Sequence, residues 1–173
     1  MIEPIEAKQQ AEVIGLTADY VARAESIFQR EFDPVDVLFD LPGGSAGMFK
    51  MQGKSCWIRY NPWLFAKYYV ENLDGTVPHE VAHYIIHRVY GMHRVRPHGQ
   101  EWLALMHKFD ADPAVTSSFD LTGIPQRRQR RYEYRCDCRT HELSARRHNS
   151  VQRGQAGYHC IKCKTELVQL ATP

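Results

Sequence analysis

The chain has 173 residues, of which 43% are hydrophobic, with 22 lysines or arginines against 20 acidic residues and a net charge of +2. This length supports one domain with a sizeable core plus a small appendage. No apolar run approaches the roughly 20 residues that a membrane-spanning helix needs, and the N-terminus lacks the basic-then-apolar order of a signal peptide. We therefore expect a compact soluble protein without a membrane partner, located in the cytoplasm.

Hydrophobic periodicity predicts short elements in the first 125 residues. In chain order these are a helix over 17–32 capped by Thr17, strands over 35–39, 47–50 and 56–60, and a helix over 62–73. Two more helices follow, one after Gly75 and one after His98, and residues 110–125 form a linking loop. Helices combined with a small antiparallel sheet indicate an α+β domain over residues 1–125.

The most informative segment is Val77–His83, where His79 and His83 stand four residues apart and Glu80 directly follows the first. Residues four apart share one face of a helix, so both imidazoles can reach one metal ion. Glu80 is close enough to contact a water molecule on that metal without being a ligand. This is the HExxH pattern of zincins, with two nitrogens on Zn²⁺ and a carboxylate as general base.

The surrounding residues favour a helix at this motif. Thr76 is expected to cap it, Pro78 suits its first turn and Gly91 suits its end. An apolar stripe follows the helical spacing at Val77, Val81, Ala82, Ile85, Ile86 and Val89. The alternative is a pair of core histidines that match by chance. It is the weaker interpretation, because an unpartnered imidazole on a buried helix is costly.

A catalytic zinc usually has three protein ligands and one open position for water. The other histidines in reach are His87, His93, His98 and His107. One straight helix cannot easily wrap three ligands around a tetrahedral ion, which disfavours His87. His98 opens a second amphipathic run that has Trp102 on its apolar face, and it can point back toward the first helix. We predict His98 as the third ligand, with His107 in a surface or packing role.

Two segments, His79–His83 and Arg96–Trp102, resemble the SprT family of zinc metallopeptidases. Spartan, a eukaryotic relative in that family, degrades proteins crosslinked to DNA. The resemblance extends upstream to Ile58–Pro62 and downstream to the C-terminal cysteines, so it spans roughly residues 18–170. It implies a zincin-like metallopeptidase domain with a C-terminal zinc ribbon, in which His98 is the third zinc ligand and Glu80 the catalytic residue.

The cysteines predict a second, structural zinc ion. Cys56 stands alone in a strand-like stretch and is expected to be a small buried hydrophobe. The other four are Cys136, Cys138, Cys160 and Cys163. The last two form half of a zinc-ribbon pattern, whereas one residue separates the first two and His141 follows closely. The ligand set therefore stays open among Cys136, Cys138 and His141. A reducing compartment makes disulfides a poor alternative.

Charge divides the chain near Pro125. Residues 1–125 carry 11 basic and 16 acidic residues, whereas residues 126–173 carry 11 basic and 4 acidic residues. The arginines expected to contact nucleic acid are Arg127, Arg128, Arg130, Arg131, Arg135, Arg146 and Arg147. Tyr132, Tyr134 and Tyr158 lie among them and could stack on unpaired bases. A solvated linker and ribbon face is the alternative. We predict a basic zinc-ribbon subdomain over 126–173 that binds single-stranded or damaged DNA.

These features together predict a zinc-dependent protease that hydrolyses proteins bound or crosslinked to DNA, with Glu80 as general base on zinc-bound water. DNA binding would place it at the nucleoid. The strand over 47–50 or that over 56–60 would bind the substrate as an added strand. Two alternatives remain, a metal-dependent hydrolase of nucleic acid and a non-catalytic nucleic-acid-binding zinc protein. The position of Glu80 favours the peptidase, since a purely structural site has no use for a carboxylate there.

Overall fold

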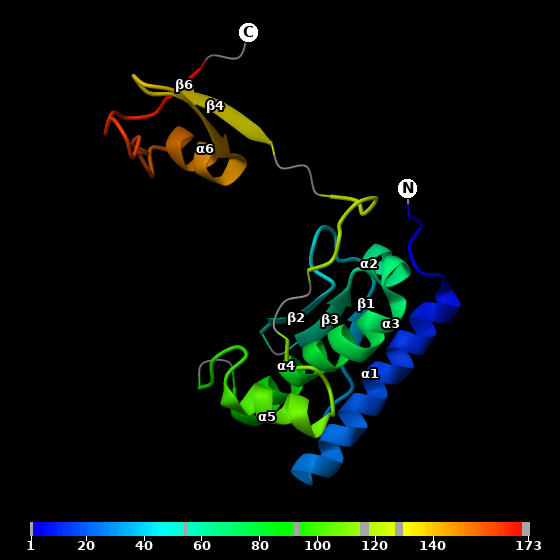
Figure 1. Ribbon diagram of the computed structural model, residues 1–173. Coiled ribbons are helices and arrows are strands. Elements are labelled where there is room, and N and C mark those ends of the chain that lie inside the picture. Colours follow the sequence, from blue (N-terminus) through cyan, green and yellow to red (C-terminus); the bar gives the residue numbers. More distant parts are fainter. Residues whose placement is uncertain (1, 54, 92–93, 115–117, 127–129, 171–173) are drawn as a thin grey trace. The chain divides into compact units, whose positions relative to one another are not determined.

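The computed structural model describes residues 2–53, 55–91, 94–114, 118–126 and 130–170. The chain forms two compact units, Met1–Gln126 and Arg127–Pro173 (Figure 1). Within the described ranges, no helix combines the length and hydrophobicity that a bilayer crossing requires. Each unit has one small three-stranded sheet, combined with several helices in the first unit and with a single helix among the described residues of the second.

The first helix, α1 (Ala7–Phe28), begins ten residues before the predicted position. Glu6 and Gln9 form a capping box at its start, which satisfies backbone N–H groups of the first turn. Thr17 is therefore an interior residue and not a cap. Its hydroxyl donates to the Val13 carbonyl at 2.8 Å and lies 3.1 Å from the Tyr60 hydroxyl. The prediction failed because the early turns are mostly exposed and carry no apolar stripe.

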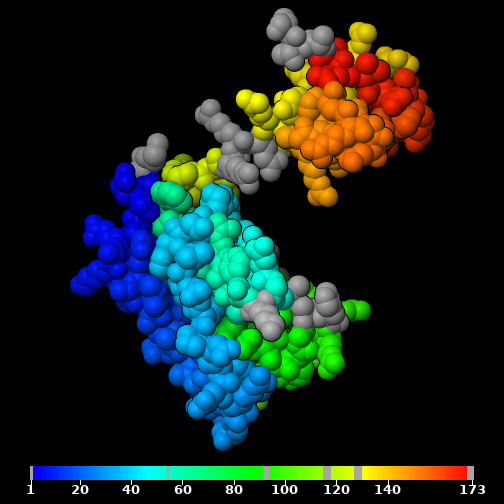
Figure 2. All heavy atoms as spheres, turned by 180° about the vertical axis from the view of Figure 1, so that it is seen from behind, coloured from blue at the N-terminus to red at the C-terminus, as the bar shows by residue number. Residues whose placement is uncertain are grey.

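The sheet of the first unit contains β1 (Asp36–Leu38), β2 (Gly47–Gln52) and β3 (Ser55–Tyr60), in the order β1-β3-β2. Strands β2 and β3 form an antiparallel hairpin, whereas β1 runs parallel to β3. The predicted antiparallel sheet is thus wrong for β1. The eight residues between β1 and β2 carry the chain past β3 instead of turning it tightly. This arrangement leaves β2 at an edge, and Figure 2 shows β2 and β3, in cyan, at the surface.

The predicted helix over 62–73 is divided into α2 (Pro62–Lys67), α3 (Tyr69–Glu71) and the π-helical segment η1 (Asn72–Thr76). This segment leads without a break into α4 (Val77–Tyr90). Thr76 has helical backbone angles and makes no cap, which corrects the prediction. Its hydroxyl donates instead to the buried Asn72 side chain at 2.7 Å. Gly91 ends α4 with φ 80°, as the sequence predicted.

Helix α4 packs against α1, β2, β3 and the following helix α5 (Gln100–Lys108), so it lies at the centre of the first unit. The large buried side chains around it include Tyr60, Phe65, Tyr84, Ile85, Trp102 and Phe109. After α5, the described residues up to Gln126 form neither helix nor strand. Lys67 holds this segment by donating to the carbonyls of Asp120 and Thr122, at 2.8 and 2.9 Å. Helix α4, which carries His79 and His83, is therefore held by packing on several sides.

The second unit has an antiparallel sheet of β4 (Arg131–Arg135), β5 (Thr140–Ser144) and β6 (Val168–Gln169), in the order β5-β4-β6. A helix that the sequence did not predict, α6 (Ala145–Gln152), follows β5. It escaped prediction because its eight residues are mostly polar and show no apolar stripe. The buried core of this unit is small and comprises Tyr134, Leu143, Cys160 and Leu167.

Candidate metal centres

Three histidine rings converge in the first unit. His79 and His83 lie on successive turns of α4, and His98 comes from the turn before α5. The Nε2 atom of His83 is 3.1 Å from that of His79 and 2.9 Å from that of His98, and the third separation is 3.1 Å. Three ring nitrogens cannot all donate to one another, so this triangle is better explained as the donor set of a metal ion.

The backbone before α5 points His98 at the other two rings. His98 has φ 56°, in the left-handed region, and the Gly99 amide donates to the Arg96 carbonyl at 2.9 Å. A Cβ atom at Gly99 would lie 2.9 Å from that same carbonyl oxygen. The turn therefore requires glycine after His98, which explains one part of the second motif.

Trp102 forms the support beneath the three rings. Its ring centroid lies 4.8 Å from those of His79 and His98 and 5.7 Å from that of His83. The side chain is 1% exposed, and its indole N–H donates to the His79 carbonyl at 3.4 Å. The amphipathic pattern predicted Trp102 as an apolar packing residue of the helix. In the structure it also contacts all three candidate ligands.

The histidines have the protonation state that metal binding requires. Burial, and then the charge of His98, lowers the pKa of His79 to about 4. Burial lowers the pKa of His83 to about 3, with further contributions from His79 and His98. Burial also lowers the pKa of His98. All three rings are therefore neutral near neutral pH, and a neutral imidazole is the form that ligates.

Glu80 is buried beside this triangle and is held by the edge strand. The Phe49 amide of β2 donates to Glu80 Oε2 at 2.6 Å. Burial raises the pKa of Glu80 to about 7, although the Phe49 hydrogen bond acts in the opposite direction. A carboxyl group whose pKa lies near neutral pH suits proton transfer in both directions. Glu80 therefore has both the position and the environment of a general base.

Gly47, which sequence analysis assigned only to a strand, makes this position of Glu80 possible. A Cβ atom there would lie 2.6 Å from Glu80 Cγ and 2.7 Å from Thr76 Cγ2. Strand β2 can approach α4 only because this residue has no side chain. A glycine inside a strand pattern is the signal that could have identified it.

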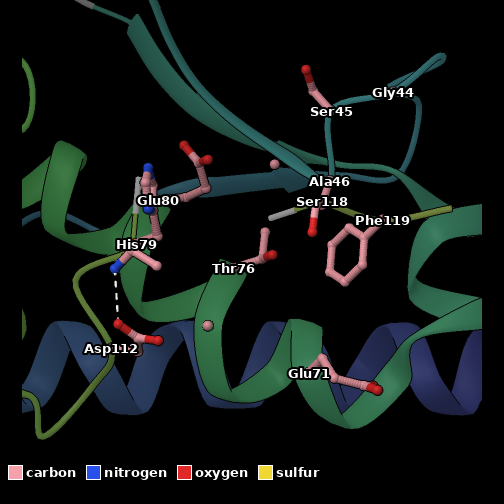
Figure 3. Close-up of a pocket in the computed structure, with 13 residues that line it drawn as sticks. Gly44, Ser45, Ala46, Glu71, Thr76, His79, Glu80, Asp112, Ser118 and Phe119 are labelled. Carbon is pink, nitrogen blue, oxygen red and sulfur yellow. Dashed lines mark hydrogen bonds between the residues drawn. The ribbon is translucent and has the colours of Figure 1, made fainter. Parts of the chain in front are cut away.

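A polar hollow of about 510 Å³ opens on one side of His79 and Glu80. Its wall includes residues before β2, the η1–α4 segment and parts of the chain after α5. Figure 3 shows the Asp112 carboxylate pointing toward the His79 ring from below. A carboxylate in this position typically fixes the orientation and tautomer of a metal-binding histidine. Asp112 was not identified from the sequence.

Zinc fits the histidine triangle. Zinc–nitrogen bonds of about 2.0–2.1 Å at tetrahedral angles separate two ligand nitrogens by roughly 3.3 Å. The separations of 2.9–3.1 Å are slightly shorter than this value. Three neutral nitrogen donors match the preference of zinc, and they leave a fourth position for water or substrate.

A second donor cluster lies in the second unit and consists of Cys136, Cys138, Cys160 and Cys163. Their sulfur atoms all lie within 4.8 Å of one another, with Cys136–Cys138 at 3.5 Å and Cys138–Cys160 at 3.7 Å. Tetrahedral Zn–S bonds of about 2.3 Å place sulfurs roughly 3.8 Å apart, so zinc fits here too. His141 is outside this cluster, and its Nε2 atom lies 3.2 Å from Cys136 Sγ.

In the second centre, backbone amides favour the thiolate form of Cys160, whereas hydrogen bonds with Cys136 and Cys163 raise the pKa of Cys138. The backbone N–H of Cys163, and less strongly that of Lys162, lowers the pKa of Cys160 to about 6. The segment with Cys136 and Cys138 is joined to the segment with Cys160 and Cys163 by a hydrogen bond from the Thr165 hydroxyl to Asp137 Oδ2 at 2.9 Å. Cys56, by contrast, lies in β3 of the first unit and belongs to neither donor cluster. Burial raises its pKa, and it is half-buried against the core, in agreement with a packing role.

Comparison with known families gives the same division of the chain. Residues 17–125 match the model of the SprT-like family, and residues 130–170 match that of the SprT-like zinc ribbon domain. The chain belongs to the SprT-like family. Among its relatives, Protein SprT of Pasteurella multocida is 40% identical over 84% of both chains. Protein SprT of Vibrio atlanticus is 39% identical over 92% of both chains. That of Klebsiella pneumoniae strain MGH 78578 is 37% identical over 94% of this chain and 93% of its own. No solved structure matches the chain significantly.

The arginines predicted to bind nucleic acid do not share one face of the SprT ribbon. Arg127 and Arg128 lie outside the described residues. The other five, Arg130, Arg131, Arg135, Arg146 and Arg147, are all exposed. Tyr132 of β4 stacks on His148 of α6 at 3.6 Å between ring centroids. Since side chains alternate along a strand, Arg131 and Arg135 face away from α6, which carries Arg146 and Arg147.

The tyrosines are less available for base stacking than the sequence suggested. Tyr134 is fully buried, and its hydroxyl lies 3.0 Å from His148 Nδ1. Tyr132 is covered on one face by the His148 ring. Tyr158 remains half-exposed, with the Arg147 guanidinium 5.5 Å from its ring centroid. Arg147 with Tyr158 is therefore the pair in this ribbon that best combines a cation with an accessible ring.

Proposed function

We propose that this SprT-family protein is a zinc-dependent metallopeptidase of the zincin-like type. Its substrates are proteins bound or crosslinked to DNA. The observation that carries the proposal is the convergence of His79, His83 and His98 beside a buried glutamate on the same helix. The second centre would hold a structural zinc in the ribbon.

The histidine centre would hold the catalytic metal. When bound there, zinc supplies Lewis-acid polarisation of water and of the scissile carbonyl. Asp112 keeps the His79 ring oriented, and Trp102 keeps the three rings together. These contacts hold the three donor nitrogens in position around the metal site before any substrate binds.

Glu80 performs the proton transfers. One carboxylate oxygen accepts a proton from the attacking water as the water oxygen bonds to the acyl carbon. The C–N bond then breaks, and Glu80 returns the proton to the leaving amine nitrogen. Edge strand β2 lies along the same site and offers main-chain groups to a substrate bound as an added strand. Such binding tolerates many sequences, which a protease acting on varied DNA-bound proteins needs.

The ribbon arginines would supply the contact with DNA. Arg146 and Arg147 extend from α6 into solvent, and Arg147 lies over the Tyr158 ring. Guanidinium groups contact phosphates, and a partly exposed ring can stack on an unpaired base. We also propose that the protein works in the cytoplasm, where reducing conditions keep the four thiols available for zinc, and at the nucleoid when it is bound to DNA.

The test is proteolysis of a basic DNA-binding protein crosslinked to a single-stranded oligonucleotide. The full chain is compared with Glu80→Gln and with Glu71→Gln, an exposed carboxylate that lines the same polar hollow. Zinc content is measured for each. We expect cleavage by wild type and Glu71→Gln, and none by Glu80→Gln with both zinc ions retained. Absence of cleavage by the zinc-loaded wild type would overturn the proposal. Cleavage of the oligonucleotide instead would indicate a nuclease.

A further inference from the structure

A second hollow, of about 400 Å³, meets the polar one at His79 and Glu80. It is bounded by β2, α4 and the turn before α5. Apart from the residues of the metal centre, its lining is mainly apolar and includes Phe49, Ile86, Val95, Pro97 and Trp102. The polar hollow, in contrast, is lined by Glu71, Thr76, Asp112 and Ser118 among others. Glu80 therefore stands between two cavities of different chemistry.

The apolar hollow carries little charge. The ring of His87, which lines it, packs on Phe49 with centroids 5.6 Å apart. Burial, and then the charge of Arg88, lowers the pKa of His87, so that this ring is neutral near neutral pH. Among the described residues that line this hollow, two are charged, Glu80 and Arg96, and Arg96 is exposed to solvent. An uncharged side chain can thus enter without leaving a buried ion unpaired.

The place of the hollow restricts what can occupy it. Its wall includes His83 and His98, whose ring nitrogens point at the metal position, and the edge strand that would align a peptide. An occupant is therefore most simply a side chain joined to a main chain that passes the metal centre. A hollow of this volume is large enough for a branched or aromatic side chain.

We propose that this hollow is a specificity subsite that takes a large apolar side chain of the substrate next to the scissile bond. The proposal rests on the peptidase function proposed above. Val95 from the pre-α5 turn and Ile86 from α4 both line the hollow, and they determine how large a side chain enters. Cleavage should then favour leucine, methionine or phenylalanine on one side of the broken bond, whatever the rest of the sequence.

Binding of small hydroxamates tests the subsite without requiring turnover. The hydroxamate group anchors each probe on the metal of the zinc-loaded full chain. The probes are acetohydroxamate and two isobutyl hydroxamates, with the side chain on the acyl side or on the amine side. We expect at least one isobutyl probe to bind roughly ten- to a hundredfold more tightly than acetohydroxamate, as burial of a leucine-like group implies. Equal affinity of all three would overturn the subsite.

Two variants of Val95 test whether the higher affinity of the isobutyl hydroxamates arises from this hollow. Val95→Phe should fill it and abolish the isobutyl gain, whereas Val95→Ala should enlarge it and favour a benzyl over an isobutyl probe. Val70→Phe is the matched control, because Val70 is 63% exposed and lies outside the hollow. Acetohydroxamate affinity reports whether each variant keeps its metal centre. An isobutyl gain that survives in Val95→Phe would contradict the proposal.

Sites of cleavage in a proteome-derived peptide library separate this inference from the function on which it rests. Cleavage with enrichment of large apolar residues on one flank, lost in Val95→Phe, supports both. Glu80-dependent cleavage without such enrichment overturns the subsite alone. An isobutyl gain without any hydrolysis overturns the peptidase and leaves an apolar binding hollow beside a metal.

Discussion

The histidine centre and the cysteine centre have similar donor geometry but depend on their surroundings in opposite ways. Two of the histidines lie on α4 and the third lies in the turn before α5, beside many fully buried side chains and with Trp102 beneath the rings. Among the described residues of the ribbon, four form the buried core, and one of them, Cys160, is itself a donor. We therefore expect the first unit to fold before it binds metal and the second to need metal to complete its core. Under the proposed function, comparable donor sets serve different purposes, chemistry in one unit and folding in the other.

Removal of zinc is the strongest test of this difference. A chelator should unfold the ribbon while the first unit stays folded, because structural zinc contributes about 10–16 kcal/mol in small zinc domains. Segment-resolved amide hydrogen exchange is the measurement. Protection should disappear over the ribbon strands and persist in α4. Cys138→Ser should reproduce the effect, and His141→Ala, outside the cluster, should not. Simultaneous loss of amide protection in both units would show that the two units do not differ in their dependence on zinc.

Gly47→Ala tests whether the first unit is shaped for chemistry. The added methyl group would lie 2.6 Å from Glu80 Cγ, so the carboxylate must move. We expect hydrolysis to fall on the order of 100-fold, as misplacement of a catalytic group does, with zinc content unchanged. The assay is steady-state cleavage alongside metal analysis. Gly15→Ala is the control, since no atom lies within 4 Å of its added Cβ. Full activity in Gly47→Ala would show that the position of Glu80 is not critical.

Asp112→Asn tests whether the Asp112 carboxylate strengthens metal binding by the histidine centre. The asparagine side chain keeps the shape but loses the charge that faces His79. Zinc affinity of this centre should decrease about 10- to 100-fold, the usual effect of removing an outer carboxylate. Competition with a chromophoric chelator measures it, and the ribbon zinc serves as an internal reference. Asp110→Asn, an exposed neighbour, should leave both affinities unchanged.

The smallest expected effect concerns DNA binding by the ribbon. Arg146→Gln with Arg147→Gln should weaken binding to a single-stranded oligonucleotide severalfold. The slope of log K against log [salt] should become less negative by about 0.7 for each phosphate contact that is lost. Arg131→Gln with Arg135→Gln should have less effect, because Glu133 and Glu142 lie opposite each other on that face. Fluorescence anisotropy at several salt concentrations measures both pairs. A larger loss from the β4 pair would assign the interface to the outer face of the sheet.

Local patterns in the sequence predicted the parts that depend on residues close in the chain. The spacing of His79 and His83 on one helix, the end of that helix at Gly91 and the two strands that become β2 and β3 were all predicted correctly. Each depends on backbone periodicity or on a single turn. The first helix was misplaced because its capping residues precede an exposed stretch. Helix α6 was missed because it is almost wholly polar.

Patterns in the sequence singled out His98, Trp102 and the cysteines, but their arrangement comes from tertiary packing. The parallel pairing of β1, the four sulfurs that lie together without His141, and the division of the arginines between two faces all depend on residues distant in sequence. Asp112, and the reason for a glycine at position 47, become recognisable only when a loop and a strand meet α4. The sequence by itself therefore determined which candidate donors and which candidate base are present. The tertiary structure decided where they meet and what surrounds them, because proximity across the chain is set by packing and not by spacing.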